Sequence, residues 1–291
     1  MHSYLRAIGF SNIKTKSQAN ILIDNAINNP TTRISTTIST NTSLVQISKD
    51  FGEGIGISII GEYDDRDTLH IEHYFPYLIG ENVTQEEEIH IEKHSNNESY
   101  SGICEDLNIG MSLIFYLYNI ADFVRTKWLN QYAKEPTMVK LSALSIKGNV
   151  LFDVLEPPTI SQTSKNTTNS RTNLIAAARA GDIDALESLT LDDMDTYTII
   201  SRRAKKEDIL TIVKSYFMPC GIETELYSVM GTILNIKKIN NTITNELVYN
   251  LTVDCNNIVL DICINSADLL GEPSLGRRFK GTIWLQGLVE L

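Results

Sequence analysis

The chain has 291 residues, of which 42% are hydrophobic and 21% are charged, and its formal net charge is −11. This is an ordinary globular composition for one large domain or two smaller ones. The acidity peaks between Glu62 and Asp106, where thirteen acidic residues accompany Arg66 and Lys93, whereas the last third of the chain is neutral. The negative charge of the acidic region would repel nucleic acid and anionic membranes, which excludes them as its partners. Nucleic acid remains a candidate partner for the last third of the chain alone.

The first 156 residues predict an acidic α+β domain, built from an antiparallel sheet with a few helices. Two of its strands alternate apolar and polar residues with period two, as half-buried strands do. The apolar run at 110–120 fits a buried strand or a helix equally well. In chain order the sequence predicts a helix over 16–29 that is stopped by Pro30, a strand at 54–63, and the two alternating strands at 68–75 and 88–94. A helix over 122–134 follows, and then two strand-like runs flank a hairpin-like turn at Lys147-Gly148.

Residues 157–173 interrupt this pattern with two prolines and many Ser, Thr and Asn residues. That composition does not support a core, so it predicts a polar linker and the best domain boundary in the chain. A helical segment is expected over 174–220, with Gly181 ending one helix and Asp182 capping the next. The helical spacing of apolar residues from Ile209 to Phe217 predicts that the helix continues to Pro219.

Residues 221–291 read as a small β-barrel. Four long strand-like runs are separated by Asn-rich turns, and glycines lie inside the strand patterns, where they mark bulges or tight bends. This pattern predicts a closed barrel of the oligonucleotide- and oligosaccharide-binding (OB-like) kind. We therefore expect an α+β chain in two parts, joined by the polar linker.

Histidines are concentrated in the acidic region, where the triplet His-Ile-Glu occurs twice. His70 and Glu72 share one face of the first strand, and His90 and Glu92 share one face of the second. If the two strands form a hairpin, each histidine lies opposite a glutamate. Imidazole and carboxylate together suit a divalent metal such as zinc or iron, although a solvated hairpin face gives the same pattern. No other cofactor is expected.

The stretch from Gly271 to Gly287 sets cationic side chains beside aromatic ones. Arg278, Lys280 and Trp284 fall on one face of a predicted strand, with Arg277 just before it. Small barrels hold phosphates with such cations and stack bases on such aromatics, so these four residues are the candidate ligand-binding set. Pairing of the arginines with nearby carboxylates is the structural alternative.

Other catalytic signatures are missing from the sequence. The chain contains no G-x-S-x-G motif, its glycine run at 52–61 lacks the ending of a phosphate loop, and its four cysteines fit no zinc spacing. The first residues form no signal peptide, and the longest apolar run is too short for a membrane span. We expect a cytoplasmic protein with reduced thiols.

Four stretches identify a family resemblance: MHSYLRAIGF, DMDTYTIISRR, SYFMPCGIETELYSVMG and LLGEPSLGRRFKGTIWLQG. Together they resemble an uncharacterised family of bacterial proteins, domain of unknown function three-eight-eight-one, over the whole chain. The resemblance implies a cytoplasmic protein of anaerobic Gram-positive bacteria. It brings no activity, cofactor or catalytic residue.

These observations favour a non-catalytic binding or scaffold protein without membrane contact. They leave its partner unknown, with a protein as one candidate. Two alternatives remain. One is a metal-dependent enzyme that uses the His-x-Glu hairpin. The other is a binder of nucleotides or single-stranded nucleic acid through the C-terminal barrel.

Overall fold

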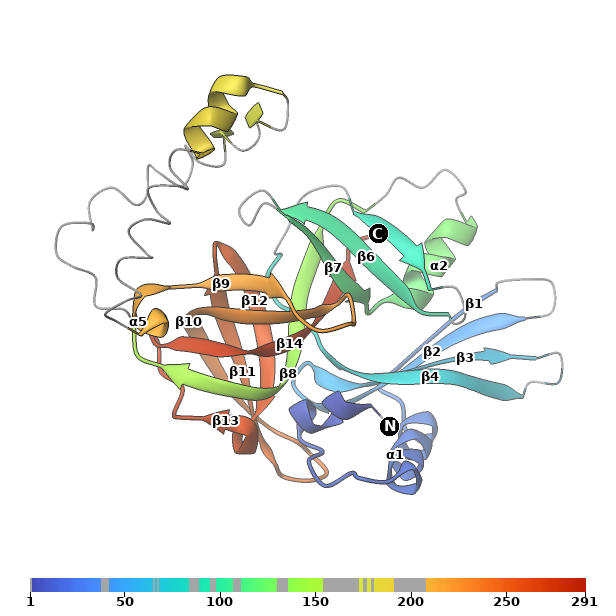
Figure 1. Ribbon diagram of the computed structural model, residues 1–291. Coiled ribbons are helices and arrows are strands. Elements are labelled where there is room, and N and C mark those ends of the chain that lie inside the picture. The colour runs from blue at the N-terminus through green and yellow to red at the C-terminus, as the bar shows by residue number, and fades with distance from the viewer. Residues whose placement is uncertain are drawn as a thin grey trace.

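The computed structural model describes residues 2–37, 42–64, 66, 68–83, 89–94, 98–106, 111–129, 136–153, 173–174, 177–178, 181–190 and 208–291. In these residues the protein is mostly β-sheet with few helices, and its strands form two sheets (Figure 1). The expected combination of strands with a few helices is therefore confirmed for the described residues.

The N-terminal sheet has four antiparallel strands in the order β1-β2-β3-β4. Its elements are the 3₁₀ helix η1 (Ser3–Ile8), α1 (Lys16–Asn28), β1 (Thr32–Thr37), β2 (Ser43–Gly52), β3 (Ile55–Tyr63) and β4 (Leu69–Leu78). A capping box formed by Thr15 and Gln18 starts α1, because each side chain accepts a hydrogen bond from the backbone of the other. The expected helix and the expected antiparallel sheet are therefore both present.

The second sheet has ten strands and contains a closed five-stranded barrel. Its elements are β5 (His90–Lys93), β6 (Tyr100–Asp106), β7 (Met111–Leu117), α2 (Ile120–Leu129), β8 (Val139–Leu151), α5 (Ile209–Ile212), β9 (Tyr216–Pro219), β10 (Leu226–Asn240), β11 (Leu247–Cys255), β12 (Ile258–Asn265), η2 (Ser266–Asp268), β13 (Leu269–Leu270) and β14 (Arg278–Val289). The run at 110–120 thus holds the whole strand β7 and the first residue of the helix α2.

The barrel closes in the order β8-β12-β11-β10-β14, with β14 returning to β8. The pair β8–β12 is parallel, and the other four pairs are antiparallel. A closed barrel was predicted for 221–291, but its fifth strand, β8, comes from the segment before residue 157. The predicted linker lies almost wholly outside the described residues, so the division of the chain into domains stays a prediction.

The expected turn at Lys147-Gly148 is wrong, because β8 runs without interruption from Val139 to Leu151. Gly148 is needed for close packing instead: a Cβ atom there would lie 2.5 Å from the ring of Phe279. A glycine that makes room for a distant side chain looks the same in the sequence as a glycine in a turn.

The predicted helix through Phe217 is also wrong at its end. The helix α5 stops at Ile212, and residues 216–219 form β9, which pairs antiparallel with β10. Phe217 is buried and its ring lies 4.8 Å from that of Tyr227. Pairing with a strand that follows in the sequence overrides the local helical pattern.

Buried polar groups join the two sheets. The Gln286 side chain of β14 donates to the carbonyl of Pro76 at 2.8 Å and accepts from the amide of Leu78 at 3.2 Å. The hydroxyl of Ser142 donates to the Leu78 carbonyl at 2.6 Å. One continuous hydrophobic core runs from Tyr4 to Val289 through both sheets, so the barrel and the N-terminal sheet pack as neighbours.

Candidate binding site

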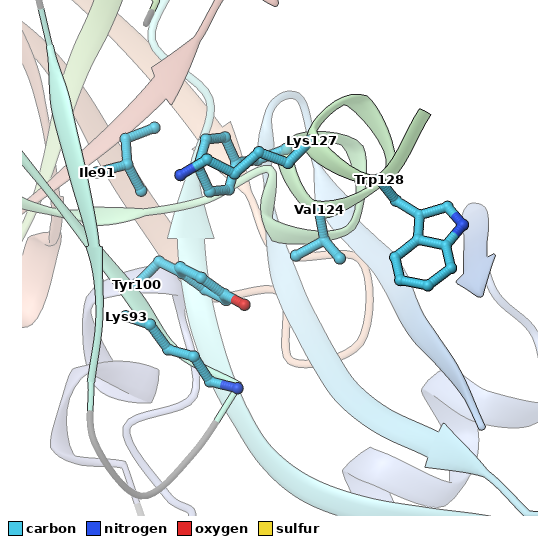
Figure 2. Close-up of a pocket in the computed structure, with 7 residues that line it drawn as sticks. Ile91, Lys93, Tyr100, Val124, Lys127 and Trp128 are labelled. Atoms are coloured by element: carbon cyan, nitrogen blue, oxygen red, sulfur yellow. The ribbon is translucent and has the colours of Figure 1, made fainter. Parts of the chain in front are cut away.

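A pocket of about 420 Å³ lies between the strands β5 and β6 and the helix α2, and we call it the α2 pocket. Its volume falls within the range of about 300–1,000 Å³ that is usual for ligand pockets. Figure 2 shows Ile91, Lys93 and Tyr100 on the strand side and Val124 and Lys127 across from them, with Trp128 further along the helix side. The lining residues are Ile91, Lys93, Tyr100, Phe123, Val124, Lys127 and Trp128.

The local sequence explains how these side chains reach the pocket. Ile91 and Lys93 are two residues apart on β5 and therefore point to the same face of the strand. In α2, Phe123 and Val124 belong to the buried side, whereas Lys127 is exposed one turn further on. The helix thus forms an apolar wall with a cationic rim.

A buried carboxylate sets the charge of one side of the pocket. Glu98 accepts hydrogen bonds from the ammonium of Lys93 and, at 2.8 Å, from the hydroxyl of Tyr100. Burial, followed by the bond to Glu98, raises the pKa of Tyr100 above its usual value, so this hydroxyl stays protonated. The charge of Lys93 is therefore matched within the protein.

The opposite side of the pocket carries a cation with no carboxylate partner among the described residues. The ammonium of Lys127 lies 4.9 Å from the centroid of the Phe123 ring, a cation–π distance. Beside it, Trp128 is 55% exposed. The described lining includes no histidine, cysteine or carboxylate, so its chemistry is that of apolar and cationic contact rather than proton transfer.

The predicted His-x-Glu hairpin is wrong, because its two strands belong to different sheets. The strand β4, with His70 and Glu72, pairs with β3, whereas β5, with His90 and Glu92, pairs with β6. Each strand pairs with a strand adjacent to it in the chain, β4 with β3 and β5 with β6.

Individually, these residues have other environments. His70 lies 3.1 Å from the carboxylate of Asp64, and Glu72 accepts a hydrogen bond from the backbone amide of Glu98 at 2.9 Å. His90 and Glu92 are exposed on the face of β5 that points away from Ile91. Within the described residues, no three His, Cys, Asp or Glu side chains come close enough together to hold a metal ion. The metal site stays a prediction without geometric support.

The two arginines of the predicted ligand set form hydrogen bonds within the protein. Arg278 is buried and donates to the backbone carbonyls of Phe152 at 2.9 Å, Leu210 at 2.8 Å and Val213 at 2.7 Å. Arg277 donates to the carbonyl of Glu272 at 3.3 Å, and its guanidinium lies 5.0 Å from the centroid of the Phe152 ring. The hydrogen bonds of both arginines go to carbonyls and, for Arg278, to the Met230 sulfur, rather than to the carboxylates of Glu272 and Asp268.

The other two predicted ligand residues are separated from the arginines and from each other. Trp284 is 5% exposed, and its ring packs against those of His2 at 4.8 Å, Tyr4 at 5.5 Å and Tyr116 at 5.1 Å. Lys280 is half-buried and lines a second, smaller pocket on the barrel wall. The four residues do not converge on one ligand.

A polar cluster that the sequence did not indicate forms around Ser101 of β6. The Ser101 hydroxyl donates to Glu225 at 2.7 Å and lies 2.6 Å from Nε2 of His94, which is itself 3.6 Å from the same carboxylate oxygen. In a catalytic triad the carboxylate orients the ring through the other nitrogen. Here serine and carboxylate meet the same nitrogen, and Ser101 is buried, so the cluster reads as a structural network. Its members are up to 131 positions apart in the sequence, which hides it from pattern analysis.

None of the helices in the described residues is long and apolar enough to cross a membrane. Comparisons with curated proteins and with solved structures gave no match. A scan against family models matches residues 5–287 to "Domain of unknown function, E. rectale Gene description (DUF3881)", as the sequence resemblance predicted. Because that match covers nearly the whole chain, the protein belongs to the DUF3881 family.

Proposed function

We propose that the protein is a non-catalytic binding module that captures an extended segment of a partner protein at the α2 pocket. One observation carries the proposal: an open pocket lined by Lys127 and Trp128 lies directly beside β5, a strand at the end of the ten-stranded sheet. The occupant is an extended peptide that offers an apolar side chain and a carboxylate.

The position of β5 favours an extended peptide. Among the described residues β5 pairs with β6 alone, and the proposal places an added strand at the other edge of β5. Ile91 and Lys93 face the pocket, and a strand added beside β5 would point alternate side chains to that same face. Backbone hydrogen bonds then give affinity, and the pocket selects a side chain.

The lining favours a partner side chain of particular chemistry. The rings of Tyr100, Phe123 and Trp128 suit an apolar or aromatic group, which buries area at low entropic cost. Lys127 suits a carboxylate, because no acidic group among the described residues pairs with it. Lys93 is already neutralised by Glu98 and contributes mainly its aliphatic stem.

We further propose that the barrel is OB-like. The order of the barrel strands supports an OB-like barrel: β10, β11 and β12 form a meander, β14 lies on the outer edge of β10, and β8 closes the barrel parallel to β12. In an OB-fold that closing strand comes last in the chain, whereas here it comes first. We also retain a cytoplasmic location as part of the proposal.

The test is selection of binding peptides from a displayed random library, with the full-length protein as bait. We expect the selected peptides to share an apolar residue close to Asp or Glu. Each of the variants Trp128→Ala and Lys127→Glu should weaken a selected peptide at least ten-fold, about 1.4 kcal/mol, as loss of an interface anchor does.

Two matched variants on α1 serve as controls. Ile21→Ala removes another exposed apolar side chain from a helix, and Lys16→Glu reverses another exposed helical lysine. Both should bind the peptide as the unmodified protein does. Equal binding by the α2 variants and the α1 variants would show that the peptide site lies elsewhere and would refute the proposal.

A further inference from the structure

A second pocket, of about 240 Å³, lies on the outer wall of the barrel, and we call it the barrel pocket. Three adjacent strands form it: β8, β14 and β10. In the paired register Lys280 lies opposite Asn149, and Ser228 lies opposite Thr282. The described lining residues are Lys147, Gly148, Asn149, Ser228, Lys280, Gly281 and Thr282.

An irregularity in the strand pairing shapes this pocket. The register between β8 and β14 shifts between Gly281 and Ile283, so β8 has one extra residue at that point. The Ser145 hydroxyl, buried behind the wall, is within hydrogen-bond distance of the carbonyls of Thr282 at 2.9 Å and Lys147 at 3.1 Å. The bulge is therefore held from inside, and its position on the wall is fixed.

The core side of the same wall is filled. Gly148 and Gly281 are directly opposite each other, and a Cβ atom on either would lie within 2.7 Å of the Phe279 ring. Since side chains alternate along a strand, the residues on either side of these glycines point outward. Lys147, Asn149, Lys280 and Thr282 therefore face solvent together, without an apolar side chain between them.

The outward face of β14 is covered at both ends and open in the middle. At one end Arg278 is buried under the residues that supply its carbonyl partners, and at the other Trp284 is covered by His2 and Tyr4. Lys280 and Thr282 lie between these two positions. The cation of Lys280 is thus placed on a half-buried wall rather than on a free loop.

The charge in the barrel pocket is unbalanced. Among the described residues the ammonium groups of Lys147 and Lys280 make no hydrogen bond or ion pair, and the described lining holds no carboxylate. A half-buried ammonium without a counter-charge costs free energy. Lys280 is such a group, whereas Lys147 is exposed at the rim of the pocket. In a chain with a net charge of −11, two lysines beside a described lining without a carboxylate favour an anionic ligand as the counter-charge.

We propose that the barrel pocket binds a phosphate monoester or inorganic phosphate. Two ammonium groups match the charge of about −1.5 to −2 that a monoester carries near pH 7. The hydroxyls of Ser228 and Thr282 and the amide of Asn149 donate further hydrogen bonds to its oxygens. The described lining offers no ring on which a base would stack, so recognition is of the phosphate group itself.

Titration of the full-length protein with inorganic phosphate at low ionic strength, followed by amide NMR, tests the site. The largest shifts should fall on the amides of Gly148 and Gly281. Lys147→Gln and Lys280→Gln should each weaken phosphate binding about ten-fold, and Lys280→Arg should keep most of it. Lys238→Gln, an exposed lysine elsewhere on the barrel strand β10, is the matched control and should bind as the unmodified protein does.

Three further binding measurements distinguish a phosphate monoester from a nucleoside and from a phosphodiester. Adenosine 5′-monophosphate should displace inorganic phosphate, and adenosine should not. An unphosphorylated oligothymidylate, which offers only diesters, should bind weakly and without dependence on Lys280. Tight oligonucleotide binding that Lys280→Gln abolishes would overturn the monoester assignment in favour of a nucleic-acid backbone. Equal losses in Lys238→Gln and Lys280→Gln would overturn the site itself.

Discussion

Arg278 binds three backbone carbonyls that come from two separate parts of the chain. Phe152 follows β8, whereas Leu210 and Val213 lie in and just after α5. The guanidinium therefore holds the ends of both segments against the barrel. Its planar set of donors suits this task better than an ammonium does.

We predict that Arg278→Ala lowers the free energy of unfolding by roughly 2–4 kcal/mol, because three partly buried carbonyls lose a charged donor. Arg277→Ala, which removes a weak hydrogen bond and a cation–π contact, should cost less than about 1 kcal/mol. Urea unfolding monitored by circular dichroism measures both. Similar small losses in the two variants would mean that Arg278 is free to serve a ligand.

Two half-buried histidines, each with a buried Nδ1 atom, should make stability depend on pH. Desolvation is the main cause that lowers the pKa of His2 and of His73 to about 4, and Nδ1 of each ring has no hydrogen-bond partner within the described residues. In the unfolded chain both titrate near 6.5. Between these values the unfolded chain binds more protons, so their stabilising contribution is complete above pH 6.5 and is lost as the pH falls toward 4.

The expected slope is about 1.4 kcal/mol per pH unit for each histidine within that window. His73→Gln should remove about half of the slope between pH 6 and 4.5. His90→Gln, at an exposed position, should leave it unchanged. Urea midpoints at four pH values measure the effect, and parallel curves for both variants would contradict it.

Among the elements, those with a strong local pattern were predictable. The strands β10, β11, β12 and β14 alternate or are continuously apolar, and α1 has both a capping box and a proline stop, so the sequence locates them closely. The errors arise where a distant partner decides. The residues of β9 satisfy a helical spacing, but pairing with β10 makes them a strand. The expected pairing of β4 with β5 failed for another reason, because each pairs with its other neighbour in the chain, β3 or β6.

Gly148 gives a sharp test of such a distant effect. Gly148→Ala places a Cβ atom 2.5 Å from Phe279 and 2.9 Å from Ile264. We predict a loss of about 1–3 kcal/mol in unfolding free energy, as for overpacked cores. The double variant Gly148→Ala with Phe279→Leu should lose less unfolding free energy than the sum of the losses of the two single variants. The smaller side chain at position 279 relieves the clash. Strict additivity in urea unfolding would show that Phe279 does not constrain Gly148.

At the scale of the whole molecule, the candidate sites depend on the arrangement of elements. Aromatic and cationic residues of the α2 pocket are ordinary in the sequence, and only the position of α2 across the pocket from β5 and β6 groups them. Lys280 was identified as a candidate, but its neighbour Lys147 lies 133 positions away on β8. The sequence predicts a barrel, yet nothing local to β8 reveals that it is the closing strand.

The position of β8 leads to a prediction about the chain as a whole. Its register with β14 extends from Val139 opposite Val289 to Leu151 opposite Arg278, and its other edge pairs with β12. If a protease site is inserted after Thr167, in the predicted linker, cleavage should leave the two fragments bound, because separating them would remove a strand from the closed barrel.

The cleaved protein should elute as one species and unfold in one transition, since a single core spans both fragments. The fragment 174–291 expressed alone should lack cooperative unfolding, and co-expression with 1–156 should restore it. Size-exclusion chromatography and thermal melting measure these outcomes. Two fragments that separate and each melt cooperatively would instead establish the predicted linker as a true domain boundary, with β8 dispensable for the barrel.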